Sequence, residues 1–163
     1  MIITGKAICL GDNINTDEII PGRHLSLTNP QDLAHYAFID TLPTFTKILS
    51  NESIIVAGQN FGCGSSREQA VICLKYAGVK AILAHSFARI FFRNAINIGL
   101  PVIESSTAVS AIKNNHQLKI NMETGSIENI STNEHWQVTP LPSWMIDMIN
   151  AGGYIPWMKK NKR

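Results

Sequence analysis

The sequence predicts an α/β fold in which a partly parallel sheet is followed by a β-rich C-terminal part. Strand-like and helical stretches alternate between residues 53 and 103, and several short strand-like stretches separated by turns lie between residues 118 and 138. The chain has 163 residues, of which 45% are hydrophobic, and this length suits a single core. We therefore expect one domain over residues 1–163.

The N-terminal part predicts a strand, a polar loop and a helix. Residues 1–10 alternate enough in hydrophobicity for a short strand, and the cluster Gly11-Asp12-Asn13 should turn the chain. Residues 12–27 are expected to form a polar loop. A helix should then start at Asn29-Pro30, because Asn is a strong N-cap residue and Pro fits the first helical turn.

The middle of the chain predicts strands and helices in strict alternation. The strands are expected at residues 53–57, 79–84 and 99–103, and the helices at residues 69–76 and 86–95. A glycine-rich turn, residues 60–68, connects the first of these strands to the first helix. This order implies right-handed crossovers onto a parallel sheet.

The C-terminal part predicts mainly short strands. A helix is expected at residues 107–113, strands at 118–122, 126–130 and 134–138, and a further helix at 143–150. The turn Glu123-Thr124-Gly125 favours a hairpin. The Gly152-Gly153 pair is suited to a left-handed C-cap at the end of the last helix.

Composition and charge argue against several classes of protein. The formal net charge is only +2, and the positive charge clusters in a tail, Lys159, Lys160, Lys162 and Arg163, which suggests a solvated end rather than a nucleic-acid patch. No apolar run is long enough for a signal sequence or a membrane span. We expect a cytoplasmic protein that binds neither nucleic acid nor membrane.

The cysteines do not predict a disulfide or a metal site. Cys9, Cys63 and Cys73 are odd in number and have no Cys-x-x-Cys or Cys/His spacing. We therefore expect no metal ligands in this chain and a reducing compartment.

The segment Gly62-Cys63-Gly64-Ser65-Ser66-Arg67-Glu68 is the most informative for chemistry. Its glycines allow close backbone approach to a ligand, its serines stand at the start of a helix where an anion is favoured, and the guanidinium of Arg67 matches a carboxylate or phosphate. The plainer alternative is that Ser65 or Ser66 caps the helix. A phosphate loop is excluded by the missing Gly-Lys-Ser/Thr ending. A serine hydrolase elbow and a Cys63 nucleophile are weaker alternatives.

Two further groups of charged residues are ambiguous by themselves. Asp17 and Arg23 lie on either side of an Ile-Ile-Pro-Gly turn, as a turn former and a surface charge would. Arg89 and Arg93 are four residues apart on a predicted helix and would face one direction, either to bind a carboxylate or as an exposed surface.

Three long motifs together resemble the swivelling domain of the aconitase superfamily. They are residues 15–23 (Asn-Thr-Asp-Glu-Ile-Ile-Pro-Gly-Arg), 60–68 (Asn-Phe-Gly-Cys-Gly-Ser-Ser-Arg-Glu) and 86–100 (Ser-Phe-Ala-Arg-Ile-Phe-Phe-Arg-Asn-Ala-Ile-Asn-Ile-Gly-Leu), in the order and approximate spacing of that family. Gly152-Gly153 also matches, so the resemblance covers most of the chain. The length is similar to that of a free-standing small subunit of the isopropylmalate or homoaconitate type.

The resemblance implies a swivelling β/β/α three-layer domain and a hydro-lyase activity. In leucine biosynthesis, this activity isomerises 2-isopropylmalate and 3-isopropylmalate by dehydration and rehydration at the neighbouring carbon. It also implies a heterodimer or heterotetramer with a large subunit that carries a 4Fe–4S cluster, because no residue here matches the cysteines that ligate the cluster.

Site residues are carried over at the matching positions. The resemblance implies that Ser65 acts as an alkoxide base, that Arg67 holds a substrate carboxylate and that Asp17 supports the site. The remaining implied substrate contacts are Gly64, Ser66 and Arg89.

Substrate choice is expected to depend on the loop after Pro-Gly, which contains His24, Leu25, Ser26 and Leu27. Homoaconitase-like small subunits have an arginine where Ser26 stands here, and burying a third substrate carboxylate without a cation would be costly. Leu25 and Leu27 suit a branched alkyl group such as isopropyl. The loop matches neither group's common form, however. A small subunit of homoaconitase, dimethylmalate dehydratase or citraconate/methylmalate hydratase is the alternative, and a non-catalytic carboxylate-binding module is a further one.

Overall fold

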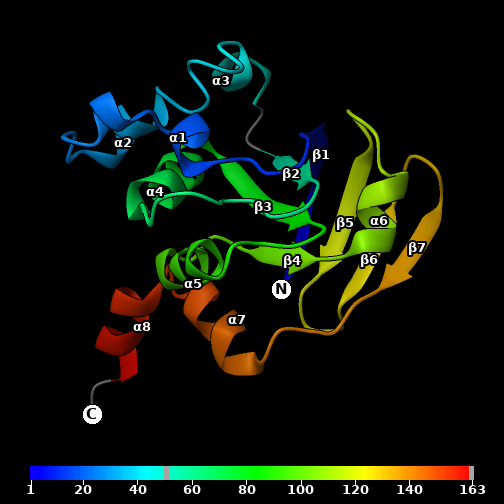
Figure 1. Cartoon of the computed structure of the whole chain (residues 1–163). Helices are drawn as coiled ribbons and strands as arrows, with labels where there is room; N and C mark the ends of the chain where they lie inside the picture. Colours follow the sequence, from blue (N-terminus) through cyan, green and yellow to red (C-terminus); the bar gives the residue numbers. More distant parts are fainter. Residues whose placement is uncertain (50–51, 162–163) are drawn as a thin grey trace.

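A computed structural model describes residues 1–49 and 52–161, and a single mixed sheet organises this part of the chain (Figure 1). Seven strands lie in the order β4-β3-β2-β1-β5-β6-β7 across the described residues. Their bounds are β1 Ile2–Cys9, β2 Ser53–Ala57, β3 Val79–Ala84, β4 Val102–Glu104, β5 Gln117–Asn121, β6 Ser126–Asn129 and β7 Glu134–Gln137.

Helices lie on the connections between the strands and after the last one. They are α1 Thr16–Ile19, α2 Pro30–Ala34, α3 Phe45–Ile48, α4 Glu68–Ala77, α5 Arg89–Ile98, α6 Ser106–Ala111, α7 Ser143–Asn150 and α8 Tyr154–Asn161, with a 3₁₀ helix η1 at Gly22–His24. In the described parts of the chain, no helix has the length and apolar character that a membrane span requires.

The middle strands of the parallel half, β2 and most of β3, are buried on both faces, which explains their apolar sequences. β1 pairs with β2, β2 with β3 and β3 with β4, all in parallel. All five residues of β2 are buried. Ile55 and Ala57 face a core shared with α4 and α5, whereas Ile54 and Val56 face a second core on the other side. Such double burial is typical of parallel sheets with covered faces.

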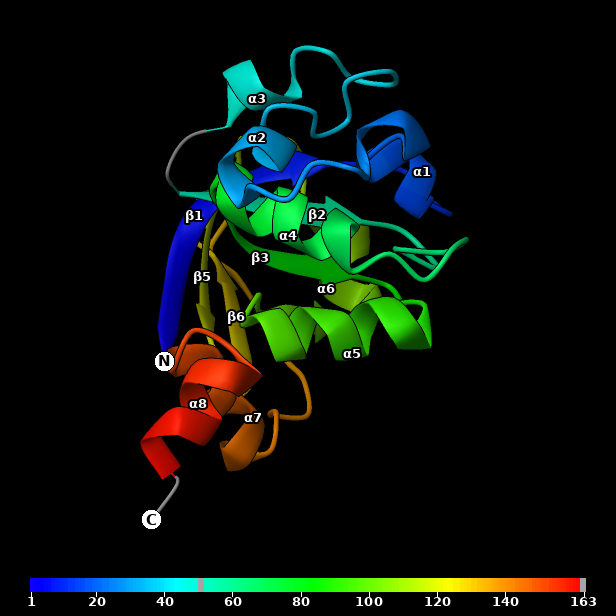
Figure 2. The same cartoon turned by 90° about the vertical axis from the view of Figure 1, so that its left-hand side faces the viewer.

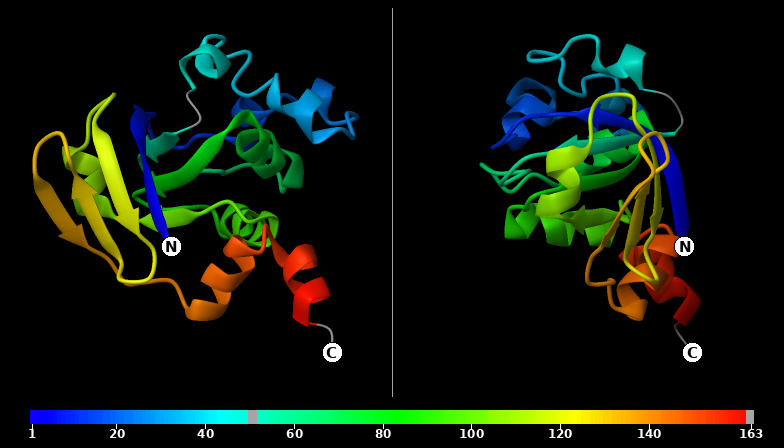
Figure 3. Two further views of the ribbon diagram at one scale, coloured as in Figure 1. Left: turned by 180° about the vertical axis from the view of Figure 1, so that it is seen from behind. Right: turned by 90° about the vertical axis from the view of Figure 1, so that its right-hand side faces the viewer.

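The antiparallel half curls over the second core. β1 pairs with β5 in antiparallel orientation, and β5, β6 and β7 continue as a meander. Leu118 and Ile120 of β5 and Ile127 of β6 pack in the same core as Ile54 and Val56. The sheet is therefore folded on itself, with α4 and α5 on its outer parallel face (Figures 1 and 3). This order of layers confirms the predicted β/β/α fold.

The predicted elements are present in the middle of the chain, but β4 begins at Val102 instead of residue 99, because Gly99 is the C-cap of α5. The N-terminal loop was predicted wrongly. The strands at residues 53–57 and 79–84 have the predicted bounds. The supposed loop at residues 12–27 contains α1 and η1. Asn15 caps α1 in a capping box with Glu18, and this sequence signal was overlooked.

Helix α5 begins later than predicted, and helix α8 was not predicted. α5 begins at Arg89 rather than at residue 86, because Phe87 is held in a parallel bridge with Phe61. α8 lies where a solvated tail was expected, and it includes Lys159 and Lys160, while Lys162 and Arg163 lie outside the described residues. Helix α8 has no buried residues, and its C-terminal end lies apart from the other elements (Figure 1).

Candidate active site

The connections that follow β1, β2 and β3 meet at the carboxyl ends of these parallel strands (Figure 2). The N–H of Gly62 donates to the carbonyl of Ile14 at 2.8 Å, and the N–H of Thr16 donates to the carbonyl of Cys63 at 2.9 Å. The N–H of Ala88 donates to the carbonyl of Phe61 at 2.9 Å. Backbone hydrogen bonds thus join all three connections at the edge where open α/β sheets bind ligands.

Two glycines allow this close approach, and both have positive φ. Gly62 has φ +77°, and a Cβ built on it would lie 2.1 Å from Cγ of Phe91. Gly64 has φ +88°, and its Cβ would lie 2.4 Å from Oδ1 of Asn15. A side chain at either position would be strained and would also displace a neighbour.

Ser65 and Ser66 are exposed and do not cap the following helix. α4 begins at Glu68, and its N-cap residue is Arg67, whose side chain makes no capping hydrogen bond. The alternative that a serine of this pair caps α4 is therefore wrong. The carbonyl of Ser65 accepts a hydrogen bond from Oγ1 of Thr16 at 2.9 Å, which holds the backbone at the serine in place.

Arg67 is held by the N-terminal connection. Its Nη1 forms an ion pair with Oδ1 of Asp17 and lies 3.4 Å from the carbonyl oxygen of Ile20, to which it donates. The Arg67 side chain is 17% exposed, while that of Asp17 is 54% exposed. The arginine is thus largely buried, and its carboxylate partner stands at the surface beside it.

A cavity of about 300 Å³ collects these groups. Of the predicted site residues, Gly64, Ser65, Ser66, Arg67 and Arg89 line it. Asp17 does not line the cavity itself but forms an ion pair with Arg67, which does. Arg93 does not line the cavity. The remaining lining residues are Thr16, Gly62, Ala88, Ile90, Phe91 and Asn94.

Of those six residues, Gly62 was considered from the sequence only as a glycine that allows close approach to a ligand, and the other five were not named as site residues. Four of them belong to residues 86–100, the third of the motifs, so its match to the family was an available signal. Helical periodicity gave no such signal, because it does not tell which face of α5 meets the glycine-rich turn.

The loop predicted to select the substrate is tied to the segment after α2 instead of lining this cavity. Arg23 forms an ion pair with Asp40, which lowers the pKa of that carboxyl through a hydrogen bond. The ring of His24 stacks on Tyr36 with centroids 3.8 Å apart. Leu25 and Leu27 are partly buried against the core that the sheet shares with α4 and α5, and Ser26 is exposed. The role of these four residues in substrate choice remains a prediction.

The three cysteines are separated in the fold. Cys73 is buried, and burial raises the pKa of its thiol to about 12. Burial also raises the pKa of the Cys9 thiol, while Sγ of Cys63 donates to the carbonyl of Asn13 at 3.3 Å. Within residues 1–49 and 52–161, no group of three or more His, Cys, Asp or Glu side chains could hold a metal ion.

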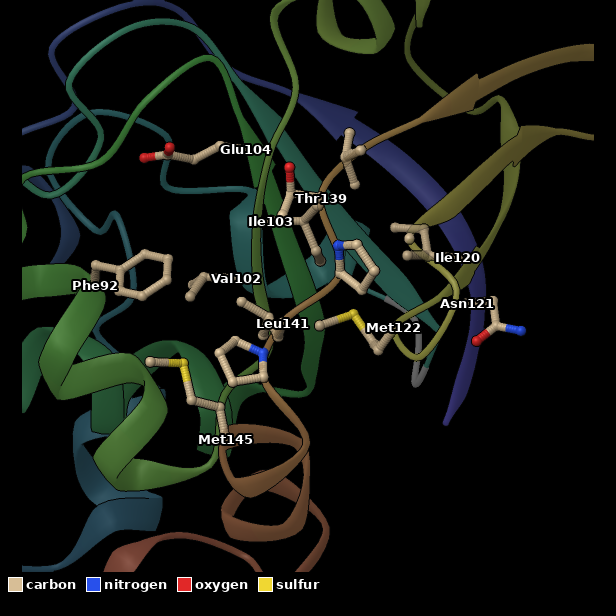
Figure 4. A pocket seen from close by; sticks show the side chains of 14 residues that line it. Phe92, Val102, Ile103, Glu104, Ile120, Asn121, Met122, Thr139, Leu141 and Met145 are labelled. Carbon is tan, nitrogen blue, oxygen red and sulfur yellow. The ribbon is translucent and has the colours of Figure 1, made fainter.

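A second cavity, of about 410 Å³, lies on the other side of α5 and has mostly apolar walls (Figure 4). Phe92, Val102, Leu141 and Met145 contribute to these walls. The carboxylate of Glu104 at its margin accepts a hydrogen bond from the N–H of Phe87 at 3.2 Å. This cavity lacks the serines and arginines of the first one, which is the better candidate for catalysis.

Comparisons with known proteins place the chain in a family. A model of the aconitase C-terminal domain matches residues 8–108. The chain is 49% identical over 159 residues to the 3-isopropylmalate dehydratase small subunit of Endomicrobium trichonymphae, with 98% of each protein covered. It is 45% identical to the isopropylmalate/citramalate isomerase small subunit of Methanocaldococcus jannaschii, which covers 98% of this chain and 95% of that protein.

A solved structure agrees with these relatives. The crystal structure of a 3-isopropylmalate dehydratase from Methanocaldococcus jannaschii matches the fold with a TM-score of 0.91 at 42% identity, covering 98% of this chain and 95% of that one. The matched family region includes every residue that lines the cavity around Ser65 and Arg67, the Ser65 cavity.

Proposed function

Because this chain belongs to the aconitase C-terminal domain family and is 49% identical to a 3-isopropylmalate dehydratase small subunit, we propose that it is the small subunit of such a hydro-lyase. The complex would interconvert 2-isopropylmalate and 3-isopropylmalate by dehydration and rehydration. The observation that carries this proposal is the cavity that contains both Ser65 and Arg67. Ser65 is exposed and does not cap α4, and Arg67 is ion-paired with Asp17.

Ser65 is the proposed base. As an alkoxide it takes the proton from the carbon next to the one that bears the hydroxyl group, the C–H electron pair forms the alkene, and the hydroxyl group leaves. Rehydration returns a proton to one carbon and a hydroxyl group to the other. The exposed position of Ser65, outside the helix and held through its carbonyl by Thr16, leaves its Oγ open to a substrate in the cavity.

Arg67 and Arg89 supply positive charge for the substrate carboxylates. The Arg67 guanidinium is a planar fork that can bind a carboxylate in a bidentate manner, and Asp17 fixes its orientation from the other side. Arg89 lines the same cavity from the first turn of α5. Gly64 and Ser66 place backbone amides next to the base, where they help to stabilise an alkoxide.

The partner is a large subunit that carries a 4Fe–4S cluster. In the proposed complex the ligands of this cluster belong to the large subunit; among the described residues of this chain, no group of three or more His, Cys, Asp or Glu side chains could hold a metal ion. When bound there, the cluster would act as a Lewis acid on the substrate hydroxyl and carboxylate. This chain would be a single swivelling domain that covers the cluster, and the complex would be cytoplasmic. The Ser65 cavity is then the surface that faces the partner.

Citramalate is a second candidate substrate, because the relative from Methanocaldococcus jannaschii is named for both isopropylmalate and citramalate. The two molecules differ only in the alkyl group at one carbon, which is methyl in citramalate and isopropyl in 2-isopropylmalate. Homoaconitate-type substrates are less favoured on the family resemblance alone, because Ser26 stands where homoaconitase-like small subunits have an arginine; the loop of Ser26 does not line the cavity.

The test is reconstitution with the large subunit from the same organism. Each subunit alone should be inactive, and the anaerobically reconstituted complex should convert 2-isopropylmalate to 3-isopropylmalate through an alkene acid. Citramalate, dimethylmalate and homocitrate serve as competing substrates in the same assay. A complex that assembles with an intact cluster and converts none of these acids would overturn the proposal in favour of a carboxylate-binding module.

A further inference from the structure

Ile90 is an exposed apolar side chain in the wall of the Ser65 cavity. It is the second residue of α5, it is 52% exposed, and it lines the same cavity as Ser65 and Arg67. Single exposed apolar residues are common on protein surfaces and need no explanation. This one differs because it lines the same cavity of about 300 Å³ as the proposed base, Ser65, and the proposed carboxylate-binding residue, Arg67.

The other apolar groups of this wall are less available to a ligand. Phe91 is 2% exposed, its ring packs against Phe61 with centroids 5.2 Å apart, and it closely abuts Gly62. Ala88 has only a methyl group. Ile90 is therefore the large apolar side chain that the described lining residues present to the cavity.

The position of Ile90 relative to the base is fixed by the backbone. The bridge between Phe61 and Phe87 and the hydrogen bond from Ala88 N–H to Phe61 carbonyl attach the start of α5 to the connection that carries Ser65. No loop movement is needed to bring Ile90 to the cavity. By contrast, Leu25 and Leu27 pack against the core that the sheet shares with α4 and α5, and they do not line the cavity.

We infer that Ile90 is a specificity-determining residue, whose side chain contacts the alkyl substituent of the substrate while Arg67 holds a carboxylate. The inference rests on the proposed function. An apolar wall removes alkyl surface from water without contributing to the chemistry, so it should favour a larger alkyl group over a smaller one. An isopropyl group would gain more from Ile90 than the methyl group of citramalate.

The experiment compares two substrates on the assembled two-subunit complex. The ratio of kcat/KM for 2-isopropylmalate to kcat/KM for citramalate is measured for the wild type, Ile90→Val and Ile90→Ala. Ile90→Ala removes three carbons from the side chain. A contact with one methylene in an apolar site changes the discrimination between two substrates, measured as a ratio of kcat/KM, by at least about tenfold. Since Ile90 is half-exposed, we expect the ratio to fall about tenfold in Ile90→Ala and by less in Ile90→Val.

Ile155→Ala is the matched control. Ile155 is also an exposed isoleucine near the start of a helix, 59% exposed on α8, but it does not line the cavity. Its substitution should leave the substrate ratio unchanged. Affinity for the large subunit is measured for every variant, and it should be the same for Ile90→Ala as for the wild type.

The failures are distinguishable. If the wild-type complex is active and Ile90→Ala lowers kcat/KM equally for both substrates, the inference is overturned and the proposed function stands. The same holds if the loss follows weaker binding of the large subunit, since Ile90 would then be an interface residue. If the wild-type complex converts neither substrate, the proposed function fails, and the inference fails with it.

Discussion

Arg67 is paired with Asp17, which lies fifty residues earlier in the chain and on a different connection of the sheet. The pair joins the connection after β1 to the one after β2, at the margin of the Ser65 cavity. The Arg67 side chain is largely buried and Asp17 is half-exposed, so the pair offsets the cost of burying the guanidinium charge and also fixes the direction of the guanidinium.

Asp17→Asn should therefore lower both activity and stability. We expect the free energy of unfolding to fall by about 1–3 kcal/mol, because the guanidinium stays largely buried without its charged partner, while misplacement of the guanidinium lowers kcat/KM by up to about a hundredfold. Glu128→Gln is the control, because Glu128 pairs with Lys119 on the antiparallel half of the sheet. Urea titrations and steady-state kinetics of the complex measure both effects. Unchanged kcat/KM in Asp17→Asn would mean that Arg67 keeps its orientation without the pair.

Ser65→Ala should abolish turnover without a measurable change in stability. Loss of a general base lowers rates by about a hundred- to ten-thousandfold, whereas removal of an exposed hydroxyl that caps no helix changes stability by less than about 0.5 kcal/mol. Ser105→Ala is the comparison, because Oγ of Ser105 accepts from the N–H of Ala108 at 3.2 Å and caps α6.

The capping serine should behave in the opposite way, with a loss of about 1 kcal/mol in stability and normal turnover. Thermal unfolding, binding of the large subunit and activity are measured on the same preparations. If Ser65→Ala retained near-normal turnover, the proposed base would have to be another group.

Gly62→Ala should destabilise the fold more than Gly78→Ala. Both glycines have positive φ, +77° and +106°, so a side chain at either position costs roughly 1–2 kcal/mol in backbone strain. A Cβ at Gly78 would meet nothing within 4 Å, whereas one at Gly62 would clash with buried Phe91. We expect the clash to add about 1–3 kcal/mol.

Equilibrium urea unfolding of the two variants isolates that steric contribution, because the backbone strain is present in both. Gly62→Ala should also lose activity, since Gly62 and Phe91 line the cavity. Equal free energies of unfolding for the two variants would show that Phe91 moves aside at no cost.

Cys73 should be unreactive in the folded protein and should make stability depend on alkaline pH. Burial raises the pKa of its thiol from the ordinary value of 9.0 to about 12, so the folded state keeps a proton that the unfolded state releases. The stabilisation is complete below pH 9 and is lost as pH rises toward 12. The slope should approach about 1.4 kcal/mol per pH unit within that window.

Cys73→Ala provides the reference, since the other titrating groups are common to both proteins. The difference in free energy of unfolding between the two should shrink or reverse between pH 9 and pH 11, measured by urea titration at each pH. At pH 8, a thiol reagent should modify the partly exposed Cys9 and Cys63 in the native protein and reach Cys73 only in urea. Rapid native labelling of Cys73 would contradict its burial.

The sequence by itself determined the elements whose signals are local. The strand at residues 53–57 is an apolar run between polar residues, and the helix that follows has its apolar residues at helical spacing, so both were found within a residue or so. The short motif around Ser65 and Arg67 was recognised as a candidate site, but on the residues alone a serine cap was an equal alternative, and the proposed role of Ser65 as a base comes from the family resemblance. Helix α1 was overlooked, although its capping box from Asn15 to Glu18 is also a local signal.

Only the tertiary structure decided which residues share a cavity. The pairing of Asp17 with Arg67, the place of Ile90 beside Ser65, and the packing of Leu25 and Leu27 away from that cavity all depend on the order of the strands. Periodicity reports which face of one element is buried, because burial repeats along the chain. It carries no information on which connections meet at the end of a sheet, since those contacts join segments tens of residues apart and form only when β1, β2 and β3 pair in register.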